Sequence, residues 1–113
     1  MYGSPIQGKA SITATASTSV TILAAVSGSR LHILKGFVSV ITPAVGTLDI
    51  MEATAGGTSA ATLFSVSTDS SGTPVFNFDF GERGYVVSAT GSRLIVEETA
   101  DATAHCVFVG YHR

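Results

Sequence analysis

Residues 75–80 read VFNFDF, and this stretch has the strictest alternation of apolar and polar residues in the chain. Successive side chains of a β-strand point to opposite sides. The pattern therefore predicts a strand with its three phenylalanines on one face and Asn77 and Asp79 on the other. Burying one such ring stabilises a fold by about 1.5–3 kcal/mol. We expect the three rings to point into a hydrophobic core, with an aromatic binding strip as the alternative.

The segments on both sides of this stretch also read as strands, because β-branched residues dominate them and Gly, Ser or Pro separate them at short intervals. The expected strands cover residues 10–16, 20–26, 31–42, 46–54, 63–68, 75–80, 85–90, 93–99 and 102–111. Gly36 is expected to cause a bend or bulge, and Gly91-Ser92 to form a two-residue hairpin turn. No window predicts a helix. Eight or nine short strands predict an all-β fold, a two-sheet antiparallel β-sandwich that is jelly-roll-like, with an immunoglobulin-like sandwich as the alternative.

The length of 113 residues is room for one domain. Residues 1–9 contain Gly3, Pro5 and Gly8 and have no core pattern, so we expect an extended N-terminal arm there. Residues 10–113 are then expected to form a single jelly-roll β-sandwich domain. The first residues have neither a basic start nor an apolar stretch, so no secretory signal is expected.

Charged residues make up only 12% of the chain, about half of the usual quarter, whereas hydrophobic residues make up 45%. The net charge is −2 and the six basic residues are spread along the sequence, so we expect no basic surface that would bind nucleic acid. No apolar run approaches the ~20 residues that span a bilayer, so no membrane contact is expected. A surface this poor in charge is expected to be covered by another chain, which favours a homo-oligomer over a monomer kept soluble by its hydroxyls.

Each motif that could carry chemistry lacks either a required residue or the spacing that would bring its residues together. Residues 3–10 read GSPIQGKA, which lacks the final Ser or Thr of a phosphate-binding loop. His32 is alone on its expected strand, and His105 and His112 are seven residues apart, so they should point to opposite faces. His105 and Cys106 should diverge for the same reason, which leaves no zinc ligand set. We therefore expect no catalytic residue, no metal and no cofactor, and a non-enzymatic protein rather than a small cupin-like enzyme.

Two groups of residues are candidate contacts with a partner. The arm offers Tyr2, Pro5, Ile6 and Lys9, which could reach a neighbouring chain. The loop after the phenylalanine strand offers Glu82 and Arg83, which could make ion pairs with a partner.

Three stretches together resemble a known group of proteins. They are ASITATASTSVTILAAVSGSRLHILKGFVSVI (residues 10–41), GTLDIMEATAGGTSAATLFSVSTDSSGTPVFNFDFGERGY (46–85) and GSRLIVEETADATAHCVFVGYHR (91–113). The pattern resembles the small jelly-roll virion proteins of tailed bacteriophages, in particular the capsid decoration or cement proteins. The resemblance implies a homotrimer on the capsid surface of the virion, bound to the major capsid protein, with no catalytic residue. The alternative is a receptor- or glycan-binding β-sandwich module of a phage head fibre or tail.

Overall fold

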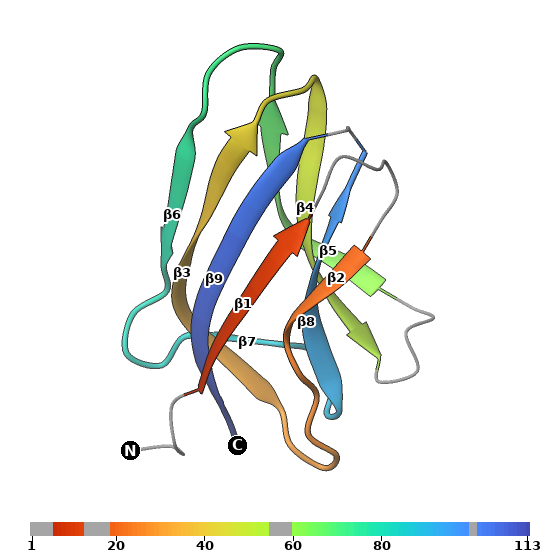
Figure 1. Cartoon of the computed structure of the whole chain (residues 1–113). Coiled ribbons are helices and arrows are strands. Elements are labelled where there is room, and N and C mark those ends of the chain that lie inside the picture. The colour runs from red at the N-terminus through yellow and green to blue at the C-terminus, as the bar shows by residue number, and fades with distance from the viewer. Residues whose placement is uncertain (1–5, 13–18, 55–59, 100–101) are drawn as a thin grey trace.

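The strands of this chain form two antiparallel sheets in a computed structural model that describes residues 6–12, 19–54, 60–99 and 102–113 (Figure 1). No helix occurs in these four ranges. The strands are β1 (Ile6–Ile12), β2 (Ser19–Leu23), β3 (Leu31–Thr42), β4 (Gly46–Thr54), β5 (Ala60–Thr68), β6 (Val75–Asp79), β7 (Tyr85–Val86), β8 (Ser92–Glu98) and β9 (Thr103–His112).

The order of the strands is that of a jelly roll. The first sheet runs β1-β9-β3-β6, with β7 also paired to β3, and the second sheet runs β2-β8-β4-β5. β6 and β7 both pair antiparallel with β3, and Phe80, which follows β6, donates its N–H to the carbonyl of Leu34 in β3. β6 and β7 therefore form one interrupted strand. Each sheet then contains four strands whose neighbours alternate between the two halves of the chain, as two interlocked Greek keys require. The expected β-sandwich is confirmed.

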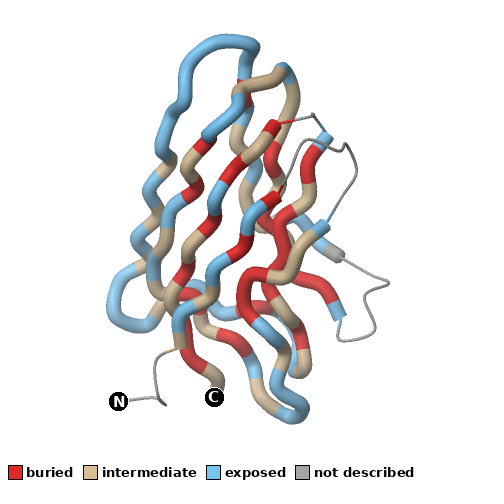
Figure 2. Tube along the Cα trace, viewed as in Figure 1, coloured by how far each residue is buried: buried red, intermediate tan, exposed pale blue. Residues whose placement is uncertain are grey.

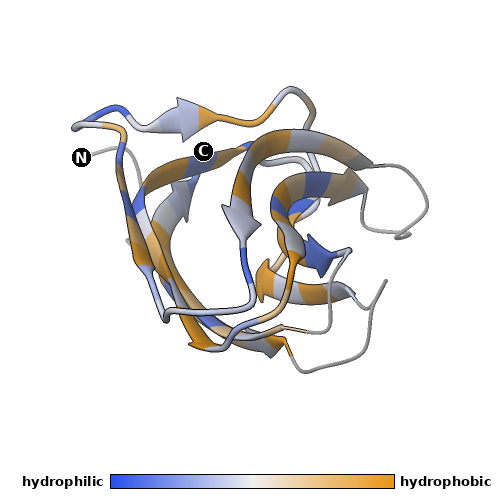
Figure 3. Cartoon of the chain, turned by 90° about the horizontal axis from the view of Figure 1, so that it is seen from above, coloured by the Kyte–Doolittle hydropathy of each residue, from blue (hydrophilic) through white to orange (hydrophobic). Residues whose placement is uncertain are grey.

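The core lies between the two sheets and is built from the inward residues of both. Buried positions alternate with intermediate or exposed ones along much of β1, β3 and β9, as Figure 2 shows by red segments between tan or pale blue ones. Figure 3 shows the same alternation in hydropathy along the strands. Phe108 is the largest fully buried side chain, and it packs with Ile12, Leu31, Ile33, Val38, Leu48, Ile50 and Leu94.

The sandwich is closed at one edge and filled by aromatic rings at the other. A Cβ on Gly8 of β1 would overlap the carbonyl oxygen of Ile22 in β2, so the glycine allows the two sheets to touch there. At the opposite edge the ring of Phe64 in β5 stacks on Phe78 and Phe80, with centroids 5.1 and 5.2 Å apart. The three phenylalanines of residues 75–80 face the core, as expected, and they are half-buried at its rim.

Two local expectations about the start of the chain and the longest strand are wrong. The arm is expected to reach residue 9, but residues 6–9 belong to β1 and pair with β9. Residues 1–5 lie outside the described residues. The two irregularities in β3 lie between Ile33 and Lys35 and between Val40 and Thr42, and neither is at Gly36. Gly36 stays in register, and its role is to leave room for the ring of Phe108.

The expected hairpin at Gly91-Ser92 is also wrong. Tyr85–Val86 pairs with β3 in the first sheet, whereas Ser92–Glu98 lies between β2 and β4 in the second. Gly91 has a φ of 71° and donates its N–H to the carbonyl of Ser29, so it does form a turn. The turn carries the chain from one sheet to the other, because the jelly roll pairs these segments with strands far away in the sequence.

Candidate functional site

The outer face of the first sheet presents a regular grid of side chains, because its register holds residues of four strands side by side. Three apolar residues, Val107, Val109 and Phe37, lie together in the two middle strands, and polar residues surround them. Across β1, β9, β3 and β6, the three rows are Ser11, His105, Ser39 and Val75, then Lys9, Val107, Phe37 and Asn77, then Gln7, Val109, Lys35 and Asp79.

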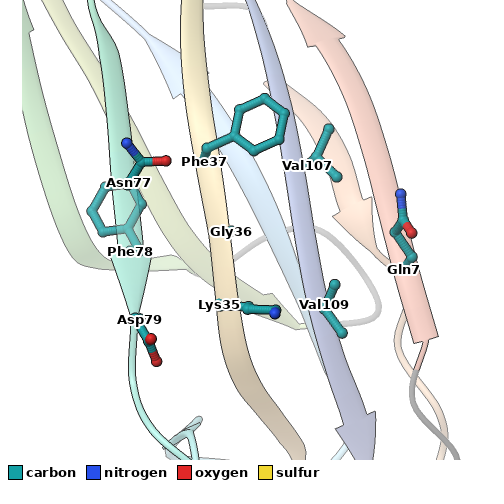
Figure 4. Close-up of a pocket in the computed structure, with 9 residues that line it drawn as sticks. All are labelled: Gln7, Lys35, Gly36, Phe37, Asn77, Phe78, Asp79, Val107 and Val109. Atoms are coloured by element: carbon teal, nitrogen blue, oxygen red, sulfur yellow. The ribbon is translucent and has the colours of Figure 1, made fainter.

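A hollow of about 440 Å³ lies across the last two of these rows, and we call it the slot. Its apolar surface comes from Phe37, Val107 and Val109, and its polar surface from four side chains. Those four are Gln7, Lys35, Asn77 and Asp79. Figure 4 shows the ring of Phe37 leaning over β9 toward Val107, with Asn77 and Asp79 on one side and Gln7 on the other.

Neighbouring residues fix several groups of the slot. The backbone of Gly36 lines it, and the inner side of that backbone is covered by the ring of Phe108. Asp79 accepts a hydrogen bond on Oδ1 from the N–H of Gly81 at 2.9 Å, which orients the carboxylate. Phe37 is 36% exposed, an unusual position for a large aromatic ring in a chain with nine aromatic residues.

A second feature lies at the end of the sandwich where β3 begins and β9 ends, and we call it the arginine pole. A hollow of about 430 Å³ is lined there by His32, Arg83, Val86, Tyr111 and Arg113. The rings of His32 and Tyr111 stack with centroids 4.6 Å apart, and the Tyr111 hydroxyl donates to the carbonyl of Arg83 at 3.4 Å.

The pole also contains Arg30, whose backbone exchanges two hydrogen bonds with the backbone of Arg113, at 2.8 and 3.0 Å. Three of the four arginines of the chain therefore meet at one end. The sequence alone does not predict this cluster, because positions 30, 83 and 113 are far apart and only the pairing of β3 with β7 and β9 brings them together.

Three of the expected contact residues, Ile6, Glu82 and Arg83, lie at this end. Ile6 pairs with Gly110, the neighbour of Tyr111, and Tyr111 bonds to Arg83. Glu82 precedes Arg83 in the same exposed loop. One expected arm contact, Ile6, and the two expected loop contacts therefore lie at one end of the fold, although positions 6 and 83 are 77 apart in the sequence. The side chain of Ile6 packs against the core.

The remaining arm candidates do not join the pole. Lys9 lies on the outer face of the first sheet, paired with Val107 and away from the start of β1. Tyr2 and Pro5 lie outside the described residues.

The histidines and the cysteine are dispersed. His105 is exposed, with Nδ1 at 3.2 Å from the Ser11 hydroxyl oxygen, whereas Cys106 points inward and is fully buried. That divergence matches the expectation. Burial raises the pKa of the Cys106 thiol from 9.0 to about 12. Within the described ranges, no three His, Cys, Asp or Glu side chains come together as a metal site, and no helix is long and apolar enough to cross a membrane.

The fold and these two surfaces define a jelly-roll β-sandwich with a mixed polar and apolar slot on one sheet and a basic pole at one end. The chain matches no protein-family model, and a search of curated proteins finds no similar sequence.

Proposed function

We propose that this chain is a non-enzymatic structural protein of a virion, a capsid decoration or cement protein that binds the outer capsid surface as a homotrimer and stabilises the head. Its support is the jelly-roll fold, the resemblance of its three sequence stretches to phage decoration proteins, and a surface with little charge. A decoration protein needs a compact domain and two kinds of contact surface, one for its sister subunits and one for the capsid.

The capsid contact is assigned to the arginine pole, and this cluster is the observation on which the assignment depends. Guanidinium groups form charge-assisted, bidentate hydrogen bonds with carboxylates, so the pole suits an acidic patch of the major capsid protein. The loop with Glu82 and Arg83 lies at the pole and adds to the contact, whereas the side chain of Ile6 packs against the core. The rest of the chain has only three basic residues, Lys9, Lys35 and Arg93, which makes the pole its main concentration of positive charge.

The subunit contact is assigned to β5, the edge strand of the second sheet. Residues 60–68 carry no charged side chain, although exposed edges of natural sheets are usually protected by charge, especially by lysine. An edge of this kind can pair with a strand of another chain, and closed symmetry lets the same contact serve every subunit. Placing the pole and β5 on different parts of the domain leaves both contacts available at once.

Capsid binding is tested by removing the protein from purified particles and adding it back. The native protein is expected to rebind and to raise the temperature at which the particles rupture. The double variant Arg83→Ala with Arg113→Ala is expected to bind at least tenfold more weakly and with a flatter dependence on salt. Lys35→Ala, which removes one positive charge from the outer face of the first sheet, is the control and should bind like the native protein. Failure of the native protein to bind any stripped capsid would overturn the proposal.

Self-association is tested by light scattering at micromolar concentration. The native chain is expected to have a mass three times 11.5 kDa. Ser67→Lys places a charge on the exposed side of β5 and should give a folded monomer, whereas Ser39→Lys on the first sheet should leave the trimer intact. A native protein that is monomeric would contradict the trimer, and a trimeric Ser67→Lys variant would contradict the use of β5.

A further inference from the structure

Gln7 is the only glutamine of this chain and Asn77 is the only asparagine, and both line the slot. They come from β1 and β6, the two outer strands of the first sheet, and from positions 70 residues apart, from 7 to 77. Most polar residues of this chain are Ser and Thr. The slot differs from the rest of the surface because it has both carboxamide side chains of the chain, one at each side. The capsid-docking proposal does not use these residues.

The chemistry of the slot suits a ligand that is uncharged and rich in hydroxyls. Each carboxamide offers both donors and an acceptor, so it can bond to two neighbouring hydroxyl groups at once. Lys35 and Asp79 are cross-strand neighbours of opposite charge, which makes the slot neutral as a whole and disfavours an anion or a cation as ligand. A hydroxyl group can accept from the ammonium and donate to the carboxylate.

The apolar part of the slot calls for a ligand with an apolar face. Phe37 presents its ring at 36% exposure, and Val107 and Val109 continue this surface across β9. Ligand sites commonly combine such apolar walls with a few convergent polar groups, and their volumes of about 300–1,000 Å³ include that of the slot. A pyranose ring has C–H groups on its faces and hydroxyls around its rim, so it satisfies both sets of groups together.

We propose that the slot is a binding site for a neutral oligosaccharide that lies across the strands of the first sheet. β1 and β6 are separated by three inter-strand spacings of ~4.8 Å, about 14 Å in total. One pyranose ring is too short to reach both Gln7 and Asn77, so the site takes at least two linked sugars. In this arrangement one sugar stacks on Phe37 next to Asn77, and the chain of sugars continues over Val107 and Val109 toward Gln7.

The test measures binding of glucose, mannose and galactose and of their linear tetrasaccharides to the full chain by isotope-edited NMR. At least one neutral tetrasaccharide is expected to bind at least tenfold more tightly than its monosaccharide, with shifts of the amide signals of Gln7 and Asn77. Phe37→Ala should weaken the binding at least tenfold, Phe37→Trp should retain it, and Gln7→Ala and Asn77→Ala should each weaken it several-fold. Val45→Ala removes part of a highly exposed apolar side chain outside the slot and is the matched control.

Two results would overturn this proposal. The first is that no neutral tetrasaccharide binds at concentrations up to about 10 mM, where a site with a Kd near 1 mM would be filled. The second is that a tetrasaccharide binds and Phe37→Ala binds it equally well. The outcome is independent of capsid docking, because Arg83→Ala with Arg113→Ala should leave saccharide binding unchanged and Phe37→Ala should leave capsid binding unchanged.

Discussion

The ring of Phe108 occupies the space that a side chain on Gly36 would need. A Cβ built on Gly36 would lie 2.5 Å from Cγ of Phe108 and 2.5 Å from the carbonyl oxygen of Val107, and the ring is fully buried. Gly36 and Gly8 both stand directly opposite Phe108 in the register of the first sheet, one on each side of it. The ring of Phe108 therefore depends on the missing side chain of Gly36, whereas Gly8 leaves room for the backbone of Ile22.

This relationship predicts that Gly36→Ala destabilises the fold by about 1–3 kcal/mol, the usual cost of extra atoms in a well-packed core. The free energy of unfolding is measured by urea denaturation. Phe108→Ala removes Cγ and Cδ2, the two side-chain atoms nearest to the new methyl group, whereas the carbonyl oxygen of Val107 stays 2.5 Å away. The double variant Gly36→Ala with Phe108→Ala should therefore recover part of the cost and be more stable than the sum of the two single effects predicts. Strict additivity would show that the ring and the glycine are not coupled.

The aromatic rim between β5 and β6 gives a second prediction. Phe64 stacks on Phe78 and Phe80 across the two sheets, so Phe64→Ala should reduce the free energy of unfolding by ~2 kcal/mol. Phe37→Ala removes the same side chain from the outer face and should cost well under half as much, because that ring supports no contact between the sheets. Equal losses in the two variants would contradict a structural role of the rim. The comparison also shows whether Phe37→Ala is a sound variant for the saccharide test.

The sequence is sufficient to predict where most strands lie and that the fold is a β-sandwich. It is not sufficient to predict which strands pair with each other in the two sheets. The alternation in residues 75–80 locates β6 and the direction of its rings, because that pattern is local. The partners of Tyr85–Val86 and Ser92–Glu98 are not local, so a turn signal at Gly91 was mistaken for a hairpin. β1 was missed at its start because Gly8 resembles a linker residue, whereas the structure uses it to bring the two sheets together.

The candidate surfaces were harder to predict for the same reason. Arg83 and Ile6 were recognised separately, but only the register of β1 and β9 and the pairing of β3 with β7 place them at one pole. The slot was not foreseen, because Gln7 and Asn77 come from the two outermost strands of a sheet whose strand order cannot be deduced from local patterns.

Glu52 gives a third prediction. Its side chain is 8% exposed, and its carboxylate accepts hydrogen bonds from both the backbone N–H and the hydroxyl of Ser88, at 3.1 and 2.8 Å. Glu52→Ala should lower the free energy of unfolding by about 1–3 kcal/mol, because the partly buried N–H loses its acceptor. Ser88→Ala removes only the hydroxyl bond and should cost less. Thermal or urea denaturation measures both, and a larger loss in Ser88→Ala would contradict the assignment of the backbone N–H as the main partner.

Cys106 gives a prediction about reactivity. Burial raises the pKa of its thiol from 9.0 to about 12, and only the thiolate attacks a disulfide reagent. At pH 8 the folded protein therefore has a thiolate fraction of about one in ten thousand, and its side chain is covered. The rate of reaction with an aromatic disulfide should rise at least a hundredfold when urea unfolds the chain. A native protein that reacts as fast as the unfolded chain would show that Cys106 is accessible.

The same raised pKa makes stability depend on pH in a defined direction. Between pH 9 and about 12 the unfolded chain releases the thiol proton while the folded chain keeps it, so the folded state binds more protons. The free energy of unfolding then falls as the pH rises through this interval, by up to ~1.4 kcal/mol per pH unit from this group. Lysine and tyrosine also titrate there, so the measurement compares the native chain with Cys106→Ala at each pH. The difference in unfolding free energy between the two proteins should shrink above pH 9, because the variant lacks this loss, and a constant difference up to pH 11 would contradict a raised pKa.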